Sequence, residues 1–289
     1  AQSKQDLRVR IAGCAMNTKL AGAAVLFFVA AAGQARDADG FFWSAKLAPG
    51  QTIEIKAVQG SIHAEGSTGT QVEVVARKKG HLEEASNARI DVVASAQGFT
   101  VCAVNAAETR DVSQTGCIPG PGSPLNTDAQ VDFIVRVPAG VRFVGRTVNG
   151  KIEARALHGD TEVHTVNGDV DLSTTGAAAV DTVNGSIVAA LAQPDSPCVR
   201  TPRRPSVCAF AGAFHTVNGN ITLSVPACAS ANVQGKTLYG NVSSDFPLSV
   251  RSESAGASVQ GNLQHGKKEL QLSTVNGSIR LRRKPGNTV

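Results

Sequence analysis

The sequence predicts an all-β fold, and more narrowly a β-solenoid, in which short strands coil around a long core and each coil packs against its neighbours. Three observations predict it: a Thr-Val-Asn-Gly motif recurs at regular spacing, apolar and polar residues alternate after each copy, and the composition suits thin layers. Aromatic residues make up only 4% of the 289 residues, whereas 29 residues are glycine. Small and β-branched side chains must therefore fill the core, which favours stacked strands.

The repeated motif sets the length of one coil. Counted from Gly150, the glycines of the motif and of its degenerate copies follow at intervals of 18, 17, 34, 21, 21 and 16 residues, and the interval of 34 equals two periods. Such a fixed period is typical of a solenoid. Degenerate copies end at Gly240 and Gly261, and an early one ends at Gly60. The complete copies place the repeated corner at Asn149, Gly150, Asn167, Gly168, Asn184, Gly185, Asn218, Gly219, Asn276 and Gly277.

Period-two alternation after each corner predicts a half-buried strand. Val170 and Leu172 alternate with Asp169 and Asp171, for example. Extended back through the corner, the same alternation turns the motif's Val and Gly inward, and stacked Asn amides are expected to hydrogen bond as a ladder along an inner corner. Asn-Gly is also the strongest short hairpin signal, so an antiparallel meander or sandwich is the alternative, although it does not require equal spacing.

The chain divides into three parts. Residues 1–35 form an upstream extension and a signal peptide: Met16 precedes a charged residue, an apolar run over 20–32 and small residues at 33 and 35. Residues 36–145 hold strand-like runs at 52–57, 71–77, 89–94, 99–104 and 131–137, and predict an irregular β-rich half that caps the stack. Residues 146–289 hold the repeat coils and a Cys-bounded insertion at 192–212. We therefore expect an exported protein (periplasmic, cell-surface or secreted) with no transmembrane span after signal removal.

Cysteine spacing agrees with an oxidising compartment. Cys102 and Cys117 flank one short loop, and Cys198 and Cys208 bracket another, so both pairs are candidate disulfides. Cys228 is then left over, and Cys208–Cys228 is an alternative pairing, because connectivity does not follow from sequence alone.

An ordered set of motifs resembles a known family. Residues 131–141 read as a strand that ends in Val-Pro, and repeated Val-Asn-Gly coils follow them. This order is similar to the bacterial putative-adhesin family of unknown function, over roughly residues 50–283. The resemblance implies a right-handed parallel β-solenoid in envelope or exported proteins, and it carries no catalytic residues. Tyr239 and Gln260 depart from the pattern, because they stand at the Asn position.

The charge pattern predicts a binding or scaffold protein of the cell envelope. Residues 1–35 carry +3 of the formal charge of +5, and the charge of about +2 on the rest is too weak to indicate a nucleic-acid partner. Two basic groups form a candidate patch for an anionic ligand, such as envelope glycans or lipid head groups; another envelope protein is the further candidate partner. The arginines of this patch are Arg200, Arg203, Arg204, Arg280, Arg282 and Arg283.

The sequence indicates no catalytic residue, cofactor or metal site, and it predicts no enzyme. His164 and His215 share a repeat position, but three periods separate them, whereas a zinc site needs several convergent ligands. The alternative is a carbohydrate-active β-helix enzyme, which requires carboxylates that converge in one groove.

Overall fold

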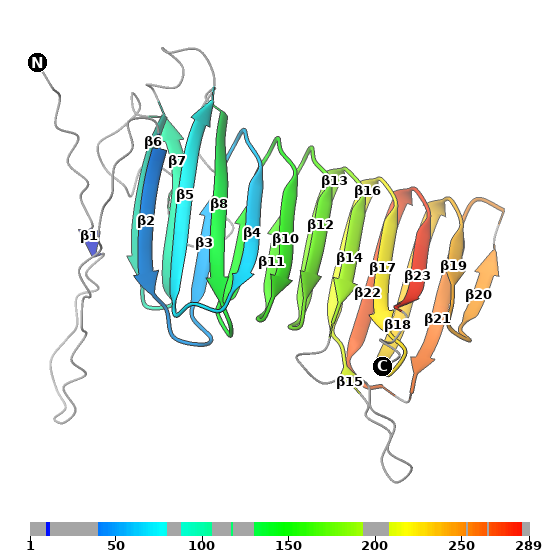
Figure 1. The fold of residues 1–289 in the computed structure, drawn as a ribbon. Helices are drawn as coiled ribbons and strands as arrows, with labels where there is room; N and C mark the ends of the chain where they lie inside the picture. The colour runs from blue at the N-terminus through cyan, green and yellow to red at the C-terminus, as the bar shows by residue number, and fades with distance from the viewer. Residues whose placement is uncertain are drawn as a thin grey trace, which may run out of the picture.

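The computed structural model describes residues 10–11, 40–79, 88–105, 117, 130–192, 208–252, 254–264 and 266–284. In this part of the chain the fold is all-β, with twenty-three strands, no helix and two large mixed sheets (Figure 1). None of these residues belongs to a helix long and apolar enough to cross a bilayer. The predicted signal peptide and residues 193–207 of the predicted insertion lie outside the described residues.

The first sheet has thirteen strands and is mostly parallel. In spatial order, its strands are β1 (Arg10–Ile11), β6 (Ala88–Ser95), β7 (Gly98–Asn105), β3 (Thr52–Lys56), β9 (Arg142–Arg146), β11 (Thr161–His164), β13 (Ala178–Asn184), β16 (Gly212–Asn218), β22 (Glu269–Asn276), β18 (Ala229–Tyr239), β21 (Ala257–Leu263) and β20 (Ser249–Ser252), with β15 (Cys208–Ala209) beside β18.

The second sheet has ten strands. In spatial order, they are β19 (Val242–Ser244), β23 (Ile279–Lys284), β17 (Ile221–Pro226), β14 (Ile187–Leu191), β12 (Val170–Thr174), β10 (Ile152–Leu157), β4 (Ile62–Ser67), β8 (Gln130–Pro138), β5 (Gln71–Lys79) and β2 (Gly40–Lys46). One cluster of buried apolar side chains contains Val163 and Val180 of the first sheet together with Leu172 and Ile187 of the second, so the core lies between the sheets.

Each copy of the motif links a strand of the first sheet to a strand of the second. β9, β11, β13, β16 and β22 each lead through a Thr-Val-Asn-Gly corner into β10, β12, β14, β17 and β23. Neighbouring copies pair in parallel and in register, as Thr182 does with Thr216 and Asn184 with Asn218. The early copy that ends at Gly60 joins the same series, because Gln59 bridges Asn149.

The expectation that each coil stacks on the next one in the chain is wrong at the C-terminal end. β22 lies between β16 and β18, and β23 lies between β17 and β19, so the last coil sits inside the stack (Figure 1). The degenerate copy that ends at Gly261 is not a corner either. It lies in β21, which runs antiparallel to β18 and pairs Gly261 with Val233.

The prediction that the alternation continues back through the corner, with the motif's Val facing inward, is also wrong. Val166 and Val217 are exposed and Asn167 is exposed, whereas the Thr before each Val is buried. The chain turns at Asn-Gly, so alternation in the strand after the corner does not continue back through it. Beyond the corner the expected alternation returns, and Val170 and Leu172 are buried.

All five strand runs expected in residues 36–145 are strands, namely β3, β5, β6, β7 and β8. The sequence did not predict β2 and β4. β4 pairs with β10, and β3 pairs with β9, so both sheets continue from the repeat coils into this half.

Candidate anionic-ligand site

A ladder of side-chain amides runs along the repeated corner. Asn167 Nδ2 donates to Asn149 Oδ1 at 2.7 Å, and Asn184 Nδ2 donates to Asn167 Oδ1 at 2.8 Å. Asn218 Nδ2 donates to Asn184 Oδ1 at 2.8 Å, and Asn276 Nδ2 donates to Asn218 Oδ1 at 2.7 Å. The amides lie on the exposed side of the corner, so they fix the spacing of neighbouring coils at the surface.

The glycine of each corner is required by close approach of the neighbouring coil. A Cβ added at Gly168 would lie 2.0 Å from the carbonyl oxygen of Gly150, and one at Gly185 would lie 2.0 Å from that of Gly168. These same carbonyls accept hydrogen bonds from buried threonines: Thr165 Oγ1 donates to Gly150 O, and Thr182 Oγ1 donates to Gly168 O, both at 3.2 Å. The sequence did not predict this role of Thr.

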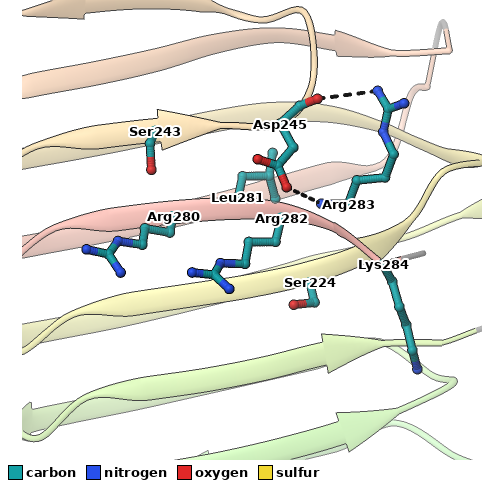
Figure 2. A pocket seen from close by; sticks show the side chains of 8 residues that line it. All are labelled: Ser224, Ser243, Asp245, Arg280, Leu281, Arg282, Arg283 and Lys284. Carbon is teal, nitrogen blue, oxygen red and sulfur yellow. Dashed lines mark hydrogen bonds between the residues drawn. The ribbon is translucent and has the colours of Figure 1, made fainter.

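The basic face is the outer surface of β23 and its neighbours β17 and β19. It is lined by Ser224, Ser243, Asp245, Arg280, Leu281, Arg282, Arg283 and Lys284. β23 alternates, so that Ile279 and Leu281 are buried while Arg280 and Arg282 are exposed on the outer side of the sheet. Figure 2 shows the two guanidinium groups lying side by side and pointing the same way. No hydrogen bond or ion pair joins either guanidinium to another described residue. The two arginines line a hollow with a volume of about 590 Å³.

Hydroxyl groups flank these arginines from both neighbouring strands. Arg280 lies between Thr222 of β17 and Ser243 of β19, and Arg282 lies beside Ser224 of β17. A hydroxyl both donates and accepts hydrogen bonds, and a guanidinium presents a planar fork of donors that matches a carboxylate or phosphate. The sequence did not reveal the hydroxyls, because the register that brings them to the arginines is not local.

Arg283 of the predicted patch has a structural role instead. Its backbone N–H donates to Asp245 Oδ2 at 3.0 Å, and its guanidinium donates to Asp245 O at 3.3 Å (Figure 2). The guanidinium also lies 5.0 Å from the centre of the Phe246 ring. Lys284 extends the basic face, whereas Arg200, Arg203 and Arg204 of the predicted patch lie outside the described residues.

Carboxylates do not converge in the basic face, whose described lining holds four basic residues and the single acidic residue Asp245. The described part of the chain holds no group of three or more His, Cys, Asp or Glu residues arranged to bind a metal ion. The site is therefore suited to holding an anion, through charge and hydrogen bonds, rather than to acid–base chemistry by paired carboxylates.

A network of charged groups lies on the outer side of the first sheet. His164 Nε2 is 2.8 Å from Glu162 Oε1, and His164 Nδ1 is 3.2 Å from Asp181 Oδ2. Burial lowers the pKa of His164, but the hydrogen bonds to Asp181 and Glu162 outweigh it and raise the pKa above 6.5. His164 and His215 are closer than the sequence spacing suggested, because each lies on a strand next to Asp181.

One of the two predicted disulfides is present. Cys102 and Cys117 are bonded, and their sulfurs are buried beside Val104. Cys198 lies outside the described residues, so the Cys198–Cys208 pair stays a prediction. Cys208 Sγ is 3.7 Å from Cys228 Sγ, which exceeds the length of a disulfide bond, so the alternative pair is not bonded here.

No family model and no curated protein matches the chain. Several solved structures are similar to it at low sequence identity. A putative cell adhesion protein from Clostridium sporogenes is 8% identical, with a TM-score of 0.43 over 85% of this chain and 100% of that one. A putative adhesin from Bacteroides fragilis is 11% identical, with a TM-score of 0.36 over 85% and 98%. A putative lipid binding protein from Parabacteroides distasonis is 9% identical, with a TM-score of 0.24 over 85% and 97%.

Proposed function

We propose that this chain is an exported, adhesin-like binding module whose basic face holds an anionic component of the bacterial cell envelope. The single observation that carries the proposal is the pair of exposed guanidinium groups, Arg280 and Arg282, without a partner among the described residues. Two like charges on one strand repel each other, and an anion between them relieves that repulsion.

We also propose that the two sheets are the walls of one β-solenoid, in which residues 146–289 form coils and residues 36–145 cap the stack. In-register parallel pairing of successive corners supports it. A solenoid suits this role because its long outer faces are the usual interaction surfaces of such proteins. Export, with residues 1–35 as extension and signal peptide, agrees with the Cys102–Cys117 disulfide.

The proposal is tested by equilibrium binding of the full chain to acidic polysaccharides and to vesicles with and without anionic phospholipid. The test variant is Arg280→Gln/Arg282→Gln. The matched control is Lys46→Gln/Lys236→Gln, which removes the same charge from exposed positions elsewhere. We expect the test variant to bind at least about tenfold more weakly, which corresponds to about 1.4 kcal/mol, and the control to bind as the wild type does.

A third variant, Arg280→Lys/Arg282→Lys, keeps the charge but loses the planar fork of donors. Intermediate affinity is expected if the arginines grip a carboxylate, sulfate or phosphate in a bidentate manner. Equal loss in the test and control variants would contradict the proposal, because binding would then follow net charge and not this face.

A further inference from the structure

A second hollow lies next to the basic face and has a different character. It has a volume of about 470 Å³, and its polar lining includes Tyr239, Asn241, Ser252 and Ser254. None of the described residues in its lining is charged. We call it the neutral hollow.

Tyr239 gives the neutral hollow an exposed aromatic ring. It is the only Tyr in the chain, it stands where the complete copies of the motif have Asn, and 63% of its surface is exposed. Its register partner is Asn276, the last amide of the ladder. The Asn at this position bonds its neighbours in the other coils, so replacing it with Tyr exchanges a structural amide for a large face open to solvent.

The backbone around Tyr239 is held in place by close contacts. A Cβ at Gly256 would lie 2.3 Å from the carbonyl oxygen of Thr237, so the backbone at Gly256 packs directly against the end of β18. A Cβ at Gly240 would lie 2.0 Å from the carbonyl oxygen of Gly277. The neutral hollow is therefore largely formed before a ligand arrives, which reduces the entropy lost on binding.

Residues only two positions apart in the chain line the neutral hollow and the basic face. Asn241, just before β19, lines the first, Ser243 of β19 lines the second, and extended chain places them about 7 Å apart. The neighbouring strand β23 has the same two-residue spacing. Ser278 Oγ, just before β23, accepts a hydrogen bond from the N–H of Asn241 at 3.3 Å, and Arg280 follows Ser278 by two residues. A short oligosaccharide spans this distance.

We propose that the ligand of this surface is an acidic glycan, with an uncharged sugar ring on Tyr239 and its neighbouring acid group on Arg280 and Arg282. The inference rests on the proposed function for its anionic end. The face of a sugar ring is largely C–H and packs on an aromatic ring, while its hydroxyl groups exchange hydrogen bonds with Asn241, Ser252 and Ser254. The phosphate of a lipid head group would bind the two arginines, but it would leave the ring of Tyr239 without a contact.

The test measures binding of the full chain to a panel of uronate and sulfated oligosaccharides, to their uncharged counterparts and to vesicles with anionic phospholipid. Tyr239→Ala is compared with Tyr239→Phe, which keeps the ring. We expect Tyr239→Ala to weaken binding of the preferred acidic oligosaccharide about tenfold and Tyr239→Phe to bind nearly as the wild type does. The uncharged counterpart should bind more weakly, and what remains of its binding should be lost in Tyr239→Ala.

The outcomes separate this inference from the proposed function. If Tyr239→Ala binds the acidic oligosaccharide normally while Arg280→Gln/Arg282→Gln does not, the acidic-glycan inference is wrong and the anionic site stands. Binding to anionic vesicles together with no binding to any oligosaccharide also overturns the inference, in favour of a membrane surface. If neither variant differs from the wild type, both proposals are wrong.

Discussion

The side-chain amide of Asn276 donates to Asn218 at 2.7 Å, although 58 residues separate the two in the chain. Between them the chain forms β17, β18, β19 and the antiparallel strands β20 and β21, and only then does it return to fill the space between β16 and β18. The last coil is therefore an internal layer of the stack, and its buried residues Leu270 and Ile279 belong to the common core.

Removing the last coil should consequently damage its neighbours. A chain that ends at Gly266 lacks β22 and β23, so β18 and β19 lose their parallel partners. We expect amide hydrogens of β18 to lose their protection from exchange. A chain that ends at Lys284 is the control and should keep it. Unchanged protection of β18 in the shorter chain would show that the last coil is not an internal layer.

The Asn ladder should contribute modestly to stability. Asn167→Ala removes two hydrogen bonds between exposed amides, so it should lower the free energy of unfolding by about 1–2 kcal/mol, measured in urea. Asn149→Ala removes one ladder bond and should cost about half as much. A loss of the same size in both variants would mean that the ladder bonds do not set the cost.

The corner glycines should tolerate substitution far less well. In Gly168→Ala the new Cβ meets backbone 2.0 Å away, so neighbouring coils must separate, and we expect a loss of at least about 3 kcal/mol or failure to fold. Gly69→Ala is the control, because the atom nearest to its new Cβ would be the Ser67 hydroxyl oxygen, 3.7 Å away, and it should change stability by less than roughly 0.5 kcal/mol. Thermal melts of both variants check this, and equal melting temperatures would refute the close-approach account.

His164 should make stability depend on pH. Its folded-state pKa is raised, so protonated His164 stabilises the fold fully below the unfolded value of 6.5, and this contribution is lost as pH rises through the folded pKa. The facing groups are Glu162, Asp181, Arg146 and, beyond Asp181, His215. We expect His164→Gln to flatten the fall in unfolding free energy above pH 6.5. His158 is exposed, so the control variant His158→Gln should show the same fall as the wild type. The same slope in wild type and His164→Gln would assign the dependence to another group.

The sequence predicted what is encoded locally and missed what depends on long-range order. Repeated Thr-Val-Asn-Gly predicted the corners, and alternation after them predicted a half-buried strand such as the one that holds Val170 and Leu172. The motif at Asn276 is identical to the others, so nothing in it says that its coil lies beside Asn218. For the same reason the hydroxyls beside the arginines were missed, and Tyr239 was noted as a departure from the motif but not as part of a site.

The most direct test of the central claim observes the two arginines themselves. The Nε–Hε signals of Arg280 and Arg282, assigned through Arg→Lys variants, are followed by NMR while the acidic oligosaccharide that binds best is added. The account predicts that both signals shift in a saturable manner with the same Kd, while those of Arg146 and Arg142, which are paired with Glu162, stay in place. Saturable binding that leaves the Arg280 and Arg282 signals unmoved would contradict it.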